Sequence, residues 1–305
     1  MDSTDIPHTP STDPSTAHHR LGILLIFVST IAWSSAGLFV RLLPFDVWTI
    51  IVWRGVFGAL FIASFVFWRF GWTTFSLIRK LGIAGVIVTL CSTAAITLFP
   101  AAFQTTSVAN ATTILAAIPF VTAAIAWVWL RERPSIPTLI ASAVALAGII
   151  IMLGPSAGGP RLGDFLAFLA TFAMALLTVI IRSRRHIEML PVAMLSILLS
   201  TLIALPFAQH LADLAPRDYL VAAGFGLFPM TLGLMLYVIG SALIPSTLSA
   251  LIGTIEAPIA ALLAWAGVGE VPATETFVGG SIVLAGVIGR LLYDWNLERR
   301  QALLV

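Results

Sequence analysis

Charged side chains are scarce in this sequence. Asp, Glu, Lys and Arg make up 10% of its 305 residues, whereas soluble domains contain about 25% of them. Hydrophobic residues make up 59% of the chain, which is more apolar surface than a water-soluble fold of this length requires. This balance argues against a soluble enzyme or regulatory domain and indicates an integral membrane protein.

Cysteine is nearly absent, and clustered histidines and phosphate-binding loops are missing. The one cysteine, Cys91, lies in an apolar run, so the sequence predicts neither a disulfide framework nor a metal site. There is no GxxxxGK[ST] stretch to bind the phosphates of ATP. A net charge of +2 is too small for a nucleic-acid-binding face. We therefore expect a protein that is not an enzyme, uses no cofactor or metal and binds no nucleic acid.

Long apolar segments are what the sequence does contain. A helix needs about 20 mostly apolar residues to cross a bilayer, and strand-like alternation is absent from the sequence. Such segments occupy residues 21–43, 46–68, 80–100, 107–130, 137–153, 163–182, 191–210, 218–240, 246–268 and 273–293. We predict an all-α integral membrane protein with ten transmembrane helices. Polar residues 1–19 are expected to form a disordered cytoplasmic tail, and residues 296–305 a C-terminal tail.

Lys and Arg are distributed unevenly between the two sides of this arrangement. If the N-terminus is cytoplasmic, twelve of the sixteen Lys and Arg residues fall in inside segments and three in outside loops. The remaining one, Arg54, lies within a span. Because cytoplasmic loops are enriched in Lys and Arg, the pattern predicts that both termini are cytoplasmic.

The sequence matches itself at a shift of about 140 residues. Pro119 corresponds to Pro258 at a shift of 139, and Glu132 corresponds to Glu270 at a shift of 138. The matches keep their order, which indicates duplication of a five-helix unit. Because five is odd, the second unit must enter the membrane from the opposite side, as in many secondary transporters with a substrate site between the halves. The two units are placed at residues 20–153 and 154–295.

Several local motifs accompany this duplicated plan. They are Thr106-Ser107-Val108-Ala109-Asn110-Ala111, Pro119, the corner Glu132-Arg133-Pro134, Glu256-Ala257-Pro258 and Gly269-Glu270. In these features the sequence resembles the EamA-type members of the drug/metabolite transporter superfamily, and within them it is most similar to the YddG-type exporters of aromatic amino acids. The resemblance implies export of amino acids or other metabolites across the bacterial inner membrane by alternating access.

Two charged residues stand out within the predicted spans. Glu256 lies roughly 18 Å deep, where a carboxylate is costly and usually faces a cavity or a partner. A structural acid beside Pro258 is the alternative. Arg54 lies roughly 12 Å from the membrane edge. It could pair with Glu256, bind a substrate carboxylate, or extend its guanidinium toward the interface.

Other candidates would line a central cavity. Trp33 lies in the middle of a span beside small polar residues, whereas the other tryptophans lie near span ends. Hydroxyl and amide groups near prolines in matching spans predict gating segments, although ordinary helix kinks account for the same residues. The predicted cavity residues are Trp33, Ser34, Ser35, Arg54, Thr93, Thr97, Phe99, Asn110, Thr112, Thr113, Met174, Met230, Tyr237 and Glu256, and the predicted helix breaks are Pro119, Pro229 and Pro258.

Together these features predict a secondary transporter that exports a small solute, an aromatic or other hydrophobic amino acid. The alternatives are a multidrug or other metabolite exporter of the same superfamily, or a non-transporting membrane subunit that handles lipid or signals. The expected partners are a small-molecule substrate and membrane lipid. Small residues at four-residue spacing should let helices pack closely, either within one copy or between copies. They therefore do not indicate whether the protein is a monomer or an oligomer. They are Ala143, Ala147, Ser281, Ala285 and Gly289.

Overall fold

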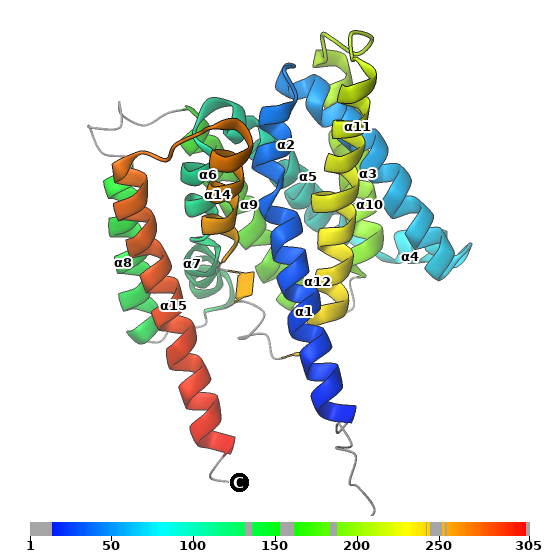
Figure 1. Cartoon of the computed structure of the whole chain (residues 1–305). Coiled ribbons are helices and arrows are strands. Elements are labelled where there is room, and N and C mark those ends of the chain that lie inside the picture. The colour runs from blue at the N-terminus through cyan, green and yellow to red at the C-terminus, as the bar shows by residue number, and fades with distance from the viewer. Residues whose placement is uncertain are drawn as a thin grey trace, which may run out of the picture.

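A computed structural model describes residues 14–131, 136–152, 162–183, 188–241, 243–244, 252–253 and 255–302. Throughout this part of the chain the regular elements are helices, and they form one bundle (Figure 1). The first unit contains α1 (Pro14–Ser34), α2 (Ala36–Leu42), α3 (Val47–Phe70), α4 (Thr73–Lys80), α5 (Gly82–Thr105), α6 (Val108–Leu115), α7 (Ile118–Leu130) and α8 (Ile136–Met152). The second contains α9 (Leu162–Ser183), α10 (Met189–Ala204), a 3₁₀ turn (Leu205–Phe207), α11 (Pro216–Phe225), a π-helical segment (Gly226–Leu232), α12 (Gly233–Ser241), α14 (Glu256–Val268) and α15 (Thr274–Ala302).

Seven helical stretches of the described chain are long and apolar enough to cross a membrane. They are His18–Leu42, Val47–Phe70, Gly82–Thr105, Val108–Trp129, Leu162–Ile180, Met189–Phe207 and Pro216–Ser241. The other three expected spans fall on α8, α14 and α15, of which α8 and α14 contain shorter apolar stretches. An all-helical membrane protein is therefore confirmed, whereas the count of ten transmembrane helices stays a prediction.

Both predicted tails are partly helical. α1 begins at Pro14, inside the segment that we expected to be a disordered tail. Proline is favoured in a first helical turn because the N–H that it lacks would have no partner there. At the other terminus α15 continues to Ala302. Residues 1–13 and the corner Glu132-Arg133-Pro134 lie outside the described residues.

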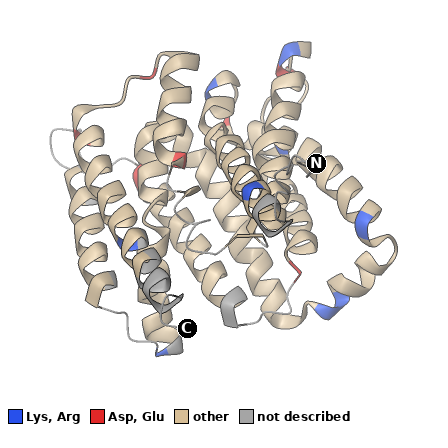
Figure 2. Cartoon of the chain, turned by 60° about the horizontal axis from the view of Figure 1, so that its bottom comes forward, with Lys and Arg blue, Asp and Glu red and all other residues tan. Residues whose placement is uncertain are grey.

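The start of α1 and the end of α15 lie at the same end of the bundle, which we call the terminal end (Figure 1). The opposite end, where α2 ends and α3 begins, is the distal end. Figure 2 shows that uncharged residues cover most of the helices, with Lys and Arg mainly near helix ends. This distribution suits helices whose middle parts face lipid.

Helices at corresponding positions of the two units pack reciprocally. α5 of the first unit packs along α9 of the second, and α12 of the second packs along α1 of the first. α3 packs along α10, and α8 packs along α15. α7 and α14 both end in a left-handed residue, Arg131 (φ 55°) and Gly269 (φ 71°), which match at the same shift as Glu132 and Glu270. Reciprocal contacts of this kind are expected from two units related by a two-fold axis.

α8 and α15 pack closely, but not through the small residues that we predicted. Their contact buries Ala141 and Ala145 against Val283 and Val287. The predicted contact residues Ala143, Ala147, Ser281, Ala285 and Gly289 are exposed instead. Packing of these residues within one copy is therefore wrong, because small residues occur on more than one face of each helix and their spacing does not indicate which face meets the partner. Packing between copies stays a prediction.

The close approach of α8 to α15 gives a prediction about stability. A methyl group added at Gly148 would lie 2.6 Å from the backbone oxygen of Gly279, which cannot rotate away as a side chain could. Gly148→Ala should therefore destabilise the fold by about 1–3 kcal/mol and lower the melting temperature of the purified protein in detergent. Gly289→Ala is the control, because no atom lies within 4 Å of its added methyl group. Equal melting temperatures for the two variants would contradict the observed packing.

Candidate functional site

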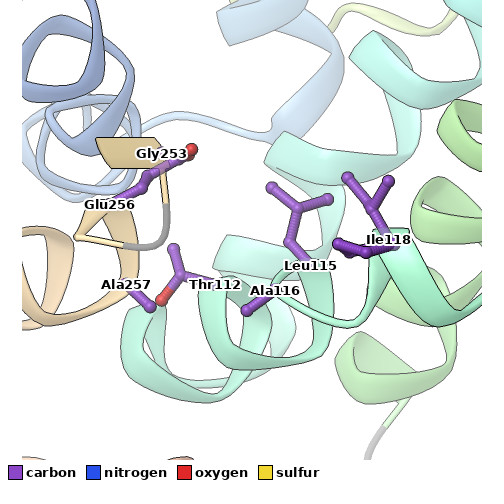
Figure 3. A pocket seen from close by; sticks show the side chains of 8 residues that line it. Thr112, Leu115, Ala116, Ile118, Gly253, Glu256 and Ala257 are labelled. Atoms are coloured by element: carbon purple, nitrogen blue, oxygen red, sulfur yellow. The ribbon is translucent and has the colours of Figure 1, made fainter. Parts of the chain in front are cut away.

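A pocket lies where an interrupted span of the first unit meets an interrupted span of the second. It has a volume of about 140 Å³. In Figure 3, Glu256 lies on one side of this space and Leu115 and Ile118 on the other, with Thr112 between them. The lining residues are Thr112, Leu115, Ala116, Ile118, Pro119, Gly253, Glu256 and Ala257.

The sequence explains why helices break at this pocket. Ser107 caps α6 by accepting a hydrogen bond from the backbone N–H of Asn110 at 3.1 Å. α6 ends at Leu115, and α7 begins three residues later at Ile118, beside Pro119, which has no N–H to continue the helical ladder. α14 begins at Glu256, two residues before Pro258. The two matching prolines thus stand in the first turns of two helices that start at the pocket.

Glu256 combines a fixed backbone with a side chain that faces the pocket. The Ser34 hydroxyl of α1 lies 3.1 Å from the backbone oxygen of Glu256, which ties α1 to the start of α14. The Thr112 hydroxyl donates to the backbone oxygen of Val108 at 2.8 Å, so its proton is used within α6. The pocket therefore combines the carboxyl group of Glu256 with a largely apolar wall.

Arg54 lies in a separate, closely packed place. Its side chain is 4% exposed, and one of its terminal nitrogens donates to the backbone oxygen of Ile96. The other terminal nitrogen lies 3.3 Å from the sulfur of Met230, and the guanidinium carbon lies 5.1 Å from the centre of the Phe225 ring. The Nε atom is buried without a hydrogen-bond partner.

Arg54 and Glu256 do not form the ion pair that we considered. Among the described residues, Glu270 forms an ion pair with Arg41, and Asp46 contacts the ring of His210. Extension of the Arg54 guanidinium to the membrane edge is also excluded, since its contacts are all inside the bundle. Sequence reasoning found both charged residues but could not find their neighbours, which lie on other helices.

The aromatic candidates Trp33 and Tyr237 contact each other rather than the pocket. Their ring centres are 5.1 Å apart. Trp33 also packs on Gly233, where an added methyl group would lie 2.6 Å from the indole ring. Ser29 donates to the backbone oxygen of Gly233 at 2.7 Å. These contacts fasten α1 to α12, directly after the π-helical segment.

The remaining candidates are used in contacts within or between helices. The Thr97 and Ser200 hydroxyls lie 2.8 Å apart, between α5 and α10. Asn110 accepts a hydrogen bond from Thr276 of α15. Ser35 and Thr113 donate to backbone oxygens of their own span. Thr93 donates within α5 and lies near Ser196. Phe99 packs on Phe103, and Met174 is partly buried against a cluster of α5, α9 and α10.

Sequence reasoning missed several of the neighbours that complete these groups. Ser196 and Ser200 are spaced four residues apart on α10, as Thr93 and Thr97 are on α5, and this shared spacing could have found them. Leu115 and Ile118 flank the break before Pro119 and could have been included on that ground. Phe225 gives no such signal, because it reaches Arg54 only through tertiary packing.

At the distal end, five residues form a hydrogen-bonded group that we call the distal cluster: Arg41, Thr106, Val108, Asp164 and Glu270. Arg41 Nε lies 2.7 Å from Glu270 Oε2, and the backbone N–H of Val108 donates to Glu270 Oε1 at 2.6 Å. Arg41 also donates to the backbone oxygen of Thr106 at 2.9 Å. The Thr106 hydroxyl donates to Asp164 Oδ1 at 2.6 Å. The cluster therefore joins both units at one end of the bundle.

Asp46 caps α3 at the same end and gives a prediction about pH. Burial acts to raise the pKa of its carboxyl, but hydrogen bonds from Thr49 and His210 outweigh this effect and lower the pKa from its ordinary value of 3.8. The stabilisation is therefore complete at neutral pH and is lost as the pH falls below about 4. Asp46→Ala should cost about 1 kcal/mol at pH 7, and its melting temperature should approach that of the wild type as the pH is lowered. Asp213→Ala is the control, because Asp213 is exposed. If the melting temperature of Asp46→Ala stays below that of the wild type by the same amount at every pH, the prediction is wrong.

The comparison with known families agrees with the internal repeat. The EamA-like transporter family matches the chain twice, over residues 20–154 and 161–292. The chain belongs to the EamA-like transporter family. An EamA-like chain is a multi-pass membrane protein, and its family indicates a transporter of the drug/metabolite transporter superfamily.

The solved structures extend this assignment to the fold. One protein crystal structure is similar to this EamA-like chain with a TM-score of 0.61 and 17% sequence identity, covering 93% of this chain and 98% of the other. At this identity the similarity concerns the fold alone. The comparison with curated proteins gives no match. The pocket of this EamA-like transporter therefore lies between the two copies of the family domain, with Thr112 from the first and Glu256 from the second.

Proposed function

We propose that this EamA-like chain is a secondary transporter that exports a small metabolite, an aromatic or other hydrophobic amino acid, by alternating access. The observation that carries the proposal is the pocket at the paired helix breaks, where one carboxyl group faces an otherwise largely apolar wall. Discontinuous helices at the interface between two repeats are where secondary transporters bind their substrates.

We further propose that the chain has ten spans, with the second unit inverted relative to the first. The reciprocal helix pairs and the two left-handed helix ends support this arrangement. The terminal end is assigned to the cytoplasm of a bacterial cell, because Lys and Arg gather there, near the start of α1 and on α4. The distal end then faces the outside.

The proposed cycle exposes the pocket to one side at a time. The distal cluster joins the two units at the outer end, and beside it Val40, Phe103 and Phe225 belong to a buried hydrophobic cluster. This closed outer end supports a state that opens toward the cytoplasm. The apolar residues Leu115 and Ile118 would contact the hydrophobic part of the solute, and Glu256 would bind its ammonium group.

Flux measurements on purified protein test this proposal. Protein reconstituted in liposomes should take up labelled phenylalanine and leucine at least about tenfold faster than liposomes that contain Glu256→Ala protein. Val128→Ala is the control, because Val128 is 82% exposed on α7, away from the pocket. Movement of drugs without amino acids would support the multidrug alternative. Absence of flux for every solute would overturn the transport proposal in favour of a non-transporting membrane subunit.

A further inference from the structure

Arg54 is a buried cation that the described chain does not neutralise. A guanidinium has five N–H donors, yet only the bond to the Ile96 backbone oxygen joins it to a strong acceptor. Its other neighbours are the Met230 sulfur and the face of the Phe225 ring, and its buried Nε atom has no hydrogen-bond partner. Buried charges in proteins are normally paired, because an unpaired one is strongly destabilising.

An irregular helical segment lies beside Arg54. Met230 belongs to the π-helical segment, and Pro229 within it removes a backbone donor. Single π-helical turns inside α-helices are rare and occur often at functional sites. A methyl group on Gly226 would lie 2.5 Å from the backbone nitrogen of Gly58, so only glycine lets this segment approach α3 so closely. Arg54 therefore lies between α3, α5 and a segment whose backbone ladder is already interrupted.

We propose that Arg54 binds the carboxylate of the transported solute, so that the substrates are small hydrophobic molecules with a free acidic group. This inference rests on the proposed transport function and adds the chemical group that the solute must carry. A guanidinium matches a carboxylate with two parallel hydrogen bonds, which an ammonium cannot reproduce. The Phe225 ring and the Met230 sulfur beside it carry no negative charge, so the carboxylate of the solute would be the counterion that Arg54 lacks.

Competition between close analogues tests the inference in liposomes. Uptake of labelled phenylalanine is measured against unlabelled phenylalanine, its carboxamide, and 3-phenylpropionate, which keeps the carboxylate but lacks the amine. The wild-type protein should be inhibited at least about tenfold more strongly by the two carboxylates than by the carboxamide. Arg54→Gln should lose this preference, Arg54→Lys should keep only part of it, and Gly289→Ala should keep all of it. Equal inhibition by acid and carboxamide in the wild type, or an undiminished preference in Arg54→Gln, would overturn the proposal.

A binding measurement separates this inference from the transport proposal. In detergent, 3-phenylpropionate should raise the melting temperature of the wild-type protein, whereas 2-phenylethylamine, which has no acidic group, should not. The increase should be absent in Arg54→Gln, and Arg54→Lys serves as the second variant if the glutamine protein is poorly folded. An acid-dependent increase without any flux would support the Arg54 site while refuting transport. Flux without any acid-dependent increase in the wild type would refute the Arg54 site alone.

Discussion

Arg41→Glu is expected to lower transport by about tenfold or more, because it places a second carboxylate against Glu270 at the distal end. The Arg41 and Glu270 side chains are only 28% and 19% exposed, so solvent screens their attraction incompletely. A change of about 1.4 kcal/mol in the free-energy difference between the two access states already changes the ratio of their populations tenfold. Glu270 also accepts the backbone N–H at the start of α6, so the substitution disturbs both units together.

The expected cause can be measured separately from the loss of transport. Cys91 is the only cysteine of the chain, so Cys91→Ser gives a background for placing one cysteine at Thr112 in the pocket. A membrane-impermeant maleimide added on the distal side should label this cysteine faster when Arg41→Glu is present. The charge-swapped pair Arg41→Glu with Glu270→Arg should restore slow labelling and part of the transport.

Arg217→Glu provides the matched control for Arg41→Glu. Arg217 is exposed on α11 and carries the same charge, but it lies outside the distal cluster. Its reversal should leave transport and labelling close to the wild-type values. If Arg217→Glu and Arg41→Glu behave alike, or if the charge swap restores nothing, the distal cluster does not control access to the pocket.

The positions of most helices could be predicted because hydropathy reports how much of a segment faces an apolar medium. The matching prolines Pro119 and Pro258 could be located for a related reason, since proline interrupts the backbone ladder whatever surrounds it. The extent of the tails could not be predicted in this way. Residues 14–19 are polar, yet they continue the helix that the apolar part of α1 begins.

Contacts between distant segments could not be predicted from one sequence. Arg41 and Glu270 are 229 residues apart, and nothing in their spacing identifies them as partners. Depth along a helix follows from counting residues, but the direction in which a side chain points depends on how the helix is rotated against its neighbours. For this reason Arg54 and Glu256 were both placed inside the membrane, while their pairing was one of several possibilities and is absent from the structure.

Glu256→Gln is expected to remove the pH dependence of uptake and to lower its rate by about tenfold. Glutamine keeps nearly the same size and can still form hydrogen bonds, but it cannot carry a charge or exchange a proton. The pocket offers Glu256 no cation among its lining residues, and Leu115, Ile118 and Ala257 are apolar. A charged carboxylate there must therefore be balanced by the ammonium group of the solute or by a proton.

This balance can be tested by comparing uptake with and without a pH gradient. Wild-type uptake should respond to the gradient, Glu256→Asp should respond more weakly, and Glu256→Gln should be unaffected by it. Glu275→Gln is the control, because Glu275 lies in the first turn of α15, outside the pocket. If Glu256→Gln keeps the wild-type pH response, Glu256 carries no proton during transport. A normal rate of uptake by Glu256→Gln would further show that binding of the solute does not require the negative charge of Glu256. Arg54, which would bind the carboxylate of the solute, would then be the one proposed charged contact.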